Sequence, residues 1–323
     1  MKEVVFLNKN SDRWKEFEDV LAHGNITPDE LADLYIGITD DLSYARTFYP
    51  DSETTYYLNR LAVKTHQTIY ANKKEEKGKF GRFWARVFPQ LVYDHKKYLL
   101  YSFLIFFFAM LIGFLSSAND ETFVRLILGD SYVNMTIENI EKGDTMAVYK
   151  KMNQADMFLG ISFNNIRVAF MAFVFGVMFS VGTGMILFYN GVMLGAFQYF
   201  FYKYDLLGES ILTIWIHGMP EIFSILVAGA AGIILGNSIL FPGTYSRLVS
   251  FKKGVIKGIK IVLGLIPIFL VAAMLEGFVT RYTGMPNILR ALIIISSMVF
   301  IAWYFFLLPY KQRIKEKHEK EIH

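Results

Sequence analysis

The chain has 323 residues, of which 54% are hydrophobic, 16% aromatic and only 19% charged, with a net charge of +4. Soluble globular domains carry about 25% charged residues, so this composition excludes an ordinary soluble protein of this length. The absence of cysteine excludes disulfides and thiolate chemistry. Because the charges gather in the first 97 residues, a few loops and the C-terminal end, we predict an all-α polytopic membrane protein with a soluble head.

Residues 1–78 are predicted to form a small helical head. The stretch TPDELADLYIG starts with Thr27, places Pro28 at the first helical position and puts Glu30 three residues after the cap. This pattern is a capping box with a proline at the first turn, and apolar residues at helical spacing follow it. The N-terminus lacks the apolar run of a signal peptide, so we expect the first membrane span to act as the insertion signal.

Residues 79–97 are predicted to form an interfacial amphipathic helix. They follow a charged linker, NKKEEKGK at 72–79, and read KFGRFWARVFPQLVYDHKK. Aromatic and aliphatic residues lie at helical spacing with arginines between them. A basic, aromatic helix of this kind just before a membrane span is typical of the bilayer interface.

The remaining chain is predicted to be a bundle of about six transmembrane helices over residues 98–310, followed by a cytosolic tail at 311–323. A hydrocarbon core of roughly 30 Å requires about 20 helical residues. Residues 168–202 contain no charged side chain, and one helix of that length would be about 52 Å long, so the chain must turn back. The best turn signal inside this segment is Asn190–Gly191. The predicted spans are 98–116, 160–188, 191–205, 210–236, 261–278 and 291–310.

The distribution of basic residues predicts the orientation. The segment before the first span, the loop at 237–260 and the tail are basic, whereas the loop at 118–160 is acidic on balance. By the positive-inside rule, both termini are then cytosolic, provided that the short third span crosses fully and is not re-entrant. The basic loops fit membrane orientation, and we expect a lipid bilayer and no nucleic acid as their partner.

Small residues recur in the predicted spans at the spacing of helix contacts. In lipid, such residues let helix backbones approach closely. We expect packing within one chain, with a homodimer face as the alternative. The residues concerned are Gly191 and Gly195 in span three, and Gly229, Gly232 and Gly236 in span four.

Span four also carries the stretch TIWIHGMPEIF, in which His217 and Glu221 are four residues apart and share one helix face. Pro220 removes a backbone donor and Gly218 loosens the same turn, so we expect a kink there. Ionisable groups at membrane depth face a bundle interior or a wet cavity. Three interpretations stay open: polar architecture, a transport or proton path, and a metal or catalytic site with Glu276 of span five as third ligand.

Other polar residues lie near the outer ends of spans two and five. Glu276 is expected to form a salt bridge at the rim of the bundle, where Arg281 and, at the start of span six, Arg290 lie nearby in the sequence. Arg167 of span two is predicted as a candidate partner. The chain contains no H-E-x-x-H, P-loop or G-x-S-x-G pattern, so we assign no catalytic residue, no cofactor and no metal ligand. The predicted intramembrane polar site comprises His217, Glu221, Glu276, Arg167, Asn164, Asn165 and Asn190.

Taken together, these segments resemble the stage II sporulation protein M-like family of prokaryotic integral membrane proteins. The resemblance rests on ELADLYIGITDDLSYARTFYP in the head, and on NNIRVAFMAFVFGVMFSVGTGMILFYNGVMLGA, HGMPEIFSILVAGAAGIILG and LEGFVT in the membrane part. It implies that the asparagine–glycine turn falls on Asn190 and Gly191, and the His-Gly-x-x-Glu motif on His217, Gly218 and Glu221. Arg281 stands where the family pattern has proline.

The resemblance implies a multi-pass protein of the prokaryotic cytoplasmic membrane that works beside other envelope proteins. The namesake accompanies peptidoglycan-degrading partners during forespore engulfment, and that sporulation role is not carried over to this chain. We expect a non-enzymatic scaffold or regulator of an envelope-associated complex. The alternatives are a transporter or channel-like translocator that uses His217 and Glu221, and, least favoured, an intramembrane hydrolase.

Overall fold

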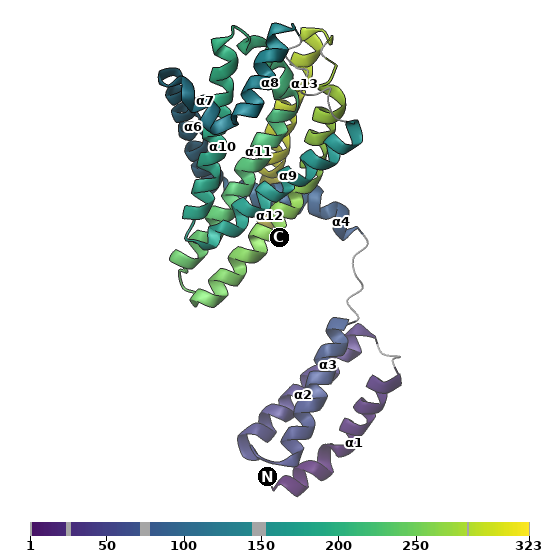
Figure 1. Ribbon diagram of the computed structural model, residues 1–323. Helices are drawn as coiled ribbons and strands as arrows, with labels where there is room; N and C mark the ends of the chain where they lie inside the picture. The colour runs from purple at the N-terminus through teal and green to yellow at the C-terminus, as the bar shows by residue number, and fades with distance from the viewer. Residues whose placement is uncertain (1, 24–26, 72–77, 144–152, 283, 323) are drawn as a thin grey trace. The chain divides into compact units, whose positions relative to one another are not determined.

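The computed structural model describes residues 2–23, 27–71, 78–143, 153–282 and 284–322, and these residues form helices and no strand (Figure 1). The all-α class predicted from composition is therefore confirmed. The chain divides into two compact units, Met1–Lys79 and Phe80–His323. The predicted linker at 72–79 lies almost wholly outside the described residues.

The N-terminal unit is a three-helix head made of α1 (Glu3–His23), α2 (Pro28–Phe48) and α3 (Glu53–Ala71). The predicted capping box forms at the start of α2: the Thr27 side chain accepts from the Glu30 backbone, and the Glu30 carboxylate accepts from the Thr27 amide. A core of apolar side chains from all three helices holds the head together. Its members are Phe6, Trp14, Phe17, Leu31, Ile38, Leu42, Ala45, Leu58, Leu61 and Ala62.

The second unit is a helix bundle. Its elements are α4 (Lys79–Arg82), the π-helix η1 (Phe83–Val87), α5 (Phe88–Asp94), α6 (Lys96–Asn119), α7 (Glu121–Leu128), α8 (Asp130–Glu141), α9 (Gln154–Val174), the 3-10 helix η3 (Phe175–Val177), α10 (Val181–Lys203), α11 (Leu207–Leu240), α12 (Arg247–Met274), the π-helix η4 (Leu275–Val279), α13 (Asn287–Ala302), the π-helix η5 (Trp303–Leu307) and α14 (Leu308–Ile322).

Six helices in the described part of the bundle are long and apolar enough to cross a membrane: Lys96–Asn119, Gln154–Val177, Val181–Lys203, Leu207–Leu240, Arg247–Val279 and Asn287–Glu319. The helix α11 is the most buried of them. It packs against α6, α9, α10, α12 and α13 (Figure 1). Other helices therefore surround α11 on most sides, and polar side chains on it are shielded from lipid.

The turn between spans two and three differs from the predicted Asn190–Gly191 turn. The chain reverses at residues 178–180, where Phe179 and Ser180 take left-handed backbone angles, with φ of 53° and 69°. Asn190 and Gly191 lie inside α10, and Asn190 donates to the carbonyl of Ile186 at 2.8 Å. Since α10 then has 23 residues, it is long enough to cross a bilayer, whereas the predicted third span was short.

Contacts with α11 explain why the turn falls at 178–180. Ser180 donates to the carbonyl of Ile233 at 3.3 Å. A Cβ on Gly236 would collide with the backbone and hydroxyl of Ser180, and one on Gly176 would collide with the carbonyl of Gly232. The turn is thus fixed by tertiary packing and not by a local turn sequence.

The predicted basic loop at 237–260 is largely helical. Ser246 caps α12, accepting from the amide of Val249, and the helix begins at Arg247. The basic residues that indicated a loop therefore lie in the first half of α12. A helix can extend beyond the apolar slab when its polar end reaches water, so charge alone does not mark the helix boundary.

The segment predicted as an interfacial helix consists of α4, η1 and α5, and it packs on the bundle. The ring of Phe88 is fully buried and occupies the space that a Cβ on Gly264 would need. Trp84 donates to the carbonyl of Gly264 at 3.1 Å, and the Tyr304 hydroxyl donates to the carbonyl of Trp84 at 2.6 Å. These contacts tie the segment to α12 and η5.

Candidate functional site

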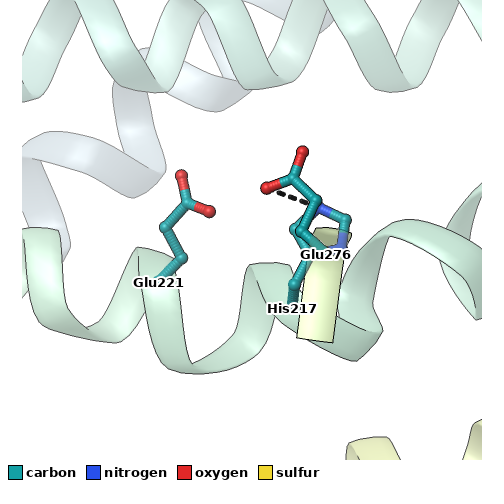
Figure 2. Close-up of side chains that lie close together, drawn as sticks. All are labelled: His217, Glu221 and Glu276. Carbon is teal, nitrogen blue, oxygen red and sulfur yellow. Dashed lines mark ion pairs between the residues drawn. The ribbon is translucent and has the colours of Figure 1, made fainter. Parts of the chain in front are cut away.

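The candidate site is a cluster of one histidine and two glutamates inside the bundle (Figure 2). His217 and Glu221 stand one turn apart on α11, so their side chains leave the helix on the same face. Glu276 comes from η4, the π-helical continuation of α12. Figure 2 shows the Glu276 carboxylate beside the His217 ring, with the Glu221 carboxylate one turn along α11.

The three side chains are close and largely shielded from solvent. One ligand atom from each of them lies within 4.8 Å of the others. The Nε2 atom of His217 lies 3.7 Å from Oε2 of Glu276, and their side chains are 6% and 16% exposed. Helical spacing on α11 supplies two members, and the packing of η4 against α11 supplies the third.

The orientation of the His217 ring is set by Thr280. The Thr280 hydroxyl donates to the carbonyl of Leu275 at 3.2 Å, and its oxygen lies 3.0 Å from Nδ1 of His217. A hydroxyl has one proton, so a hydroxyl that donates to Leu275 accepts from His217. The Nδ1 atom of His217 then carries a proton, and in the neutral ring the Nε2 lone pair faces Glu276.

Two further polar side chains surround the cluster. The Asn165 amide lies beside the Glu221 carboxylate without closing a hydrogen bond to it, and its nitrogen is buried without a partner. On the other side, the buried Arg290 donates to Thr213 at 3.2 Å, one turn before His217 on α11. Asn165 was predicted as a site residue, whereas Arg290 was expected only at the start of span six.

An open cavity of about 360 Å³ reaches the cluster. It extends from α7 and α8 to the middle of α11, with Tyr132 and Asn190 among its polar lining residues. Thus the predicted site residue Asn190 shares a cavity with His217 and Glu221, although it lies outside the cluster. The lining residues are Phe106, Ile127, Leu128, Tyr132, Asn190, Met193, Leu194, Phe197, Ile214, His217, Gly218, Glu221, Ile222 and Ile225.

The predicted ion pair between Arg167 and Glu276 does not form. The acidic group of Glu276 faces His217, whereas Arg167 and its neighbour Asn164 are exposed on the outward side of α9. The helical rotation of α9 explains the difference. Asn165 and Ala169 point inward and are buried, which turns Arg167 away from the bundle interior.

The glycines predicted as packing residues lie at helix crossings within the chain. A Cβ on Gly191 or Gly195 would collide with the backbone of α6, and one on Gly229 with Ser102 and Leu187. Gly232 and Gly236 lie against α9, α10 and the turn between them. Gly218 lines the cavity, and a Cβ added there would meet only side chains of α11 itself, Ile214 and Ile222, at ordinary contact distance. Pro220 is buried within α11, which continues through it.

Sequence reasoning did not assign a role to Thr280. The signal was present, because Thr280 follows Glu276 by four residues and shares its helix face. A buried hydroxyl at that spacing is a natural orienting partner for a histidine on a neighbouring helix. No local pattern, however, indicates which helix η4 contacts.

A bundle of six long apolar helices with ionisable side chains on its inner faces defines a polytopic helical membrane protein. Residues 102–281, more than half of the chain, match the family model described as Stage II sporulation protein M. The chain therefore belongs to the stage II sporulation protein M family, which is not a known enzyme family. Residues 4–71 match a domain of unknown function (DUF8413). No curated protein matches the chain, and no solved structure matches it either.

Proposed function

We propose that the protein is a non-enzymatic integral membrane scaffold or regulator of an envelope-associated protein complex. In this proposal it resides in the prokaryotic cytoplasmic membrane with both termini cytosolic, and the cluster of His217, Glu221 and Glu276 is its regulatory site. The observation that carries the proposal is the shape of the cavity. It reaches the cluster from the α7–α8 end, and its lining on α11 runs from Ile214 to Ile225.

Beyond Ile225, α11 is packed too closely for a path to continue along it. Gly229 lies against the side chains of Ser102 and Leu187, and Gly232 against the carbonyl of Ala172. Helices in such contact leave no space for a hydrated ion between them. A cavity that contains a polar cluster and does not continue along α11 suits binding and response better than conduction.

The two-unit organisation also supports a scaffold or regulator. The head has its own core and its own aromatic cluster. Within it, the partly buried carboxylate of Asp41 on α2 accepts from Trp14 at 2.7 Å and pairs with Arg13, which joins α2 to α1. A small folded domain on a membrane bundle offers a protein-binding surface in addition to the membrane site.

A translocator is the second candidate, and Asn190 favours it. This residue lines the cluster's cavity and also a groove of about 920 Å³ along the other half of α10. Movement of α10 could join the two spaces, as required for alternating access. The groove is, however, bordered almost entirely by apolar side chains.

A hydrolase is the weakest candidate, although Thr280, His217 and Glu276 follow one another as a nucleophile, a base and an orienting acid would. The Thr280 side chain is buried, with 2% of the residue exposed, and its hydroxyl donates to Leu275. Thr280 is also not part of the cavity lining. A substrate in the cavity therefore could not reach the hydroxyl.

Two measurements on the full chain test the proposal. Mild detergent extraction of native membranes, with in-cell crosslinking, should recover the chain in an assembly larger than two copies, and removal of residues 1–79 should reduce that assembly. Proteoliposomes should show no cation or proton flux above that of empty liposomes. Flux that Glu221→Gln abolishes would establish the translocator instead, and a mass of two chains alone would indicate a plain homodimer.

A further inference from the structure

We propose that His217, Glu221 and Glu276 bind a divalent transition-metal cation, such as Zn²⁺ or Mn²⁺, between α11 and η4. The proposal concerns what occupies the cluster, and it holds whether the protein is a scaffold, a regulator or a translocator. It rests on the convergence of three electron-pair donors in one shielded space.

The donor atoms of His217 and Glu276 face one another. The Thr280 hydroxyl accepts a hydrogen bond from Nδ1–H of His217. In the neutral ring the Nε2 lone pair then faces Oε2 of Glu276 at 3.7 Å. When both carboxyl groups are ionised, they and the imidazole lone pair repel one another, since none of the three then donates a hydrogen bond. A cation placed among them converts this repulsion into coordination.

The candidate ligand atoms are close enough for one ion to contact all three. Two ligands on one metal ion at about 2.0–2.2 Å are at most about 4.4 Å apart. The candidate ligand atoms of the cluster lie within 4.8 Å of one another, so closure around an ion requires each side chain to move by less than about 1 Å. Glu221 faces the cavity and has room for such a movement.

Neighbouring polar groups support the ligand side chains. A metal-binding histidine usually donates a hydrogen bond from its other ring N–H to an oxygen acceptor, which fixes the ring orientation and the tautomer. Thr280 occupies that position, and Leu275 in turn accepts from Thr280. The buried amide nitrogen of Asn165, which has no partner, lies beside Glu221 and can hold the second oxygen of that carboxylate.

The ligand set also restricts the ion. One imidazole and two carboxylates suit borderline cations, whereas soft cations prefer the thiolates that this chain lacks. Calcium takes six to eight oxygen ligands, more than this cluster offers. Three protein ligands with a cavity alongside leave one position for water or another small ligand, as in open zinc sites.

The charge around the cluster agrees with a divalent ion. In their ionised form the two carboxylates contribute two negative charges. A divalent ion bound by two carboxylates is neutral as a unit. Neutral units are the form in which charges are tolerated at membrane depth.

The test uses the full-length protein in detergent micelles or nanodiscs. The sample is loaded with Zn²⁺ or Mn²⁺, freed of unbound ion and analysed by elemental mass spectrometry. We expect about one metal ion per chain for one of the two ions. Glu221→Gln and Glu276→Gln should each reduce the metal content at least tenfold. The matched control is Glu209→Gln, an exposed glutamate on the same helix α11, which should keep the full content.

A second variant separates binding from folding. Thr280→Val removes the orienting hydroxyl and keeps the shape of the side chain, so the affinity should fall by about 10–100-fold while the protein still elutes as a single folded species. Thr280→Ser should restore the affinity. If the Gln variants do not fold, absorption of bound Co²⁺ in the wild-type protein, displaced by Zn²⁺, decides the question. Wild-type protein without stoichiometric metal, or variants that keep it, would overturn the proposal.

Discussion

Substitution of Gly232 by alanine is the sharpest test of how the bundle is packed. A Cβ on this residue would collide with the carbonyl oxygen of Ala172 on α9 and with the side chain of Thr183 on α10. The Ala172 carbonyl and the Thr183 side chain hold each other in place, because the Thr183 hydroxyl donates to that carbonyl at 2.7 Å. One methyl group therefore has to separate α11 from two helices at once.

The expected cost follows from these contacts. Overpacking of a dense interior costs about 1–3 kcal/mol, and loss of the hydrogen bond between Thr183 and Ala172 adds about 1 kcal/mol. The matched control is Gly184→Ala on α10, where a Cβ meets nothing within 4 Å. Both variants exchange glycine for alanine inside a helix, so the gain in helix propensity is the same in both and cancels in the difference. The difference between them should be about 2–4 kcal/mol.

The difference can be measured by reversible unfolding in mixed micelles with increasing sodium dodecyl sulfate, followed by tryptophan fluorescence of the membrane unit. A difference of about 3 kcal/mol corresponds to roughly a hundredfold change in the unfolding equilibrium constant. If the two variants unfold within about 0.5 kcal/mol of each other, the close approach of α9, α10 and α11 at Gly232 is refuted.

Two further predictions follow from the head and from α9. Thr27→Ala removes the side-chain cap that bonds with Glu30 and should destabilise residues 1–79 by about 1 kcal/mol in urea unfolding. The control is Thr47→Ala, at an exposed position of the same helix, which should stay within about 0.5 kcal/mol of wild type. Equal effects of the two substitutions would contradict the cap. Arg167→Ala and Glu276→Ala should have additive effects on the free energy of unfolding, within about 0.5 kcal/mol, because Arg167 faces outward. Strong non-additivity would instead support the ion pair expected from the sequence.

The amino-acid sequence by itself determined the class of protein and the pairing on α11. Long apolar segments and segregated charges require helices in a bilayer, because backbone groups there have to be satisfied within the segment. The capping box at Thr27 was readable, since it depends only on residues three apart. The shared face of His217 and Glu221 was readable for the same reason: a spacing of four is local geometry.

Only the tertiary structure decided the turn between α9 and α10 and the composition of the cluster. The turn at 178–180 contains no strong local signal, because its position depends on contacts of Ser180 and Gly176 with α11. Likewise, Glu276 could be named as a third ligand but not placed, and its expected partner on α9 faces outward. The rotation of each helix about its axis is set by how all its neighbours pack, and that rotation brings Glu276 and Thr280 to His217.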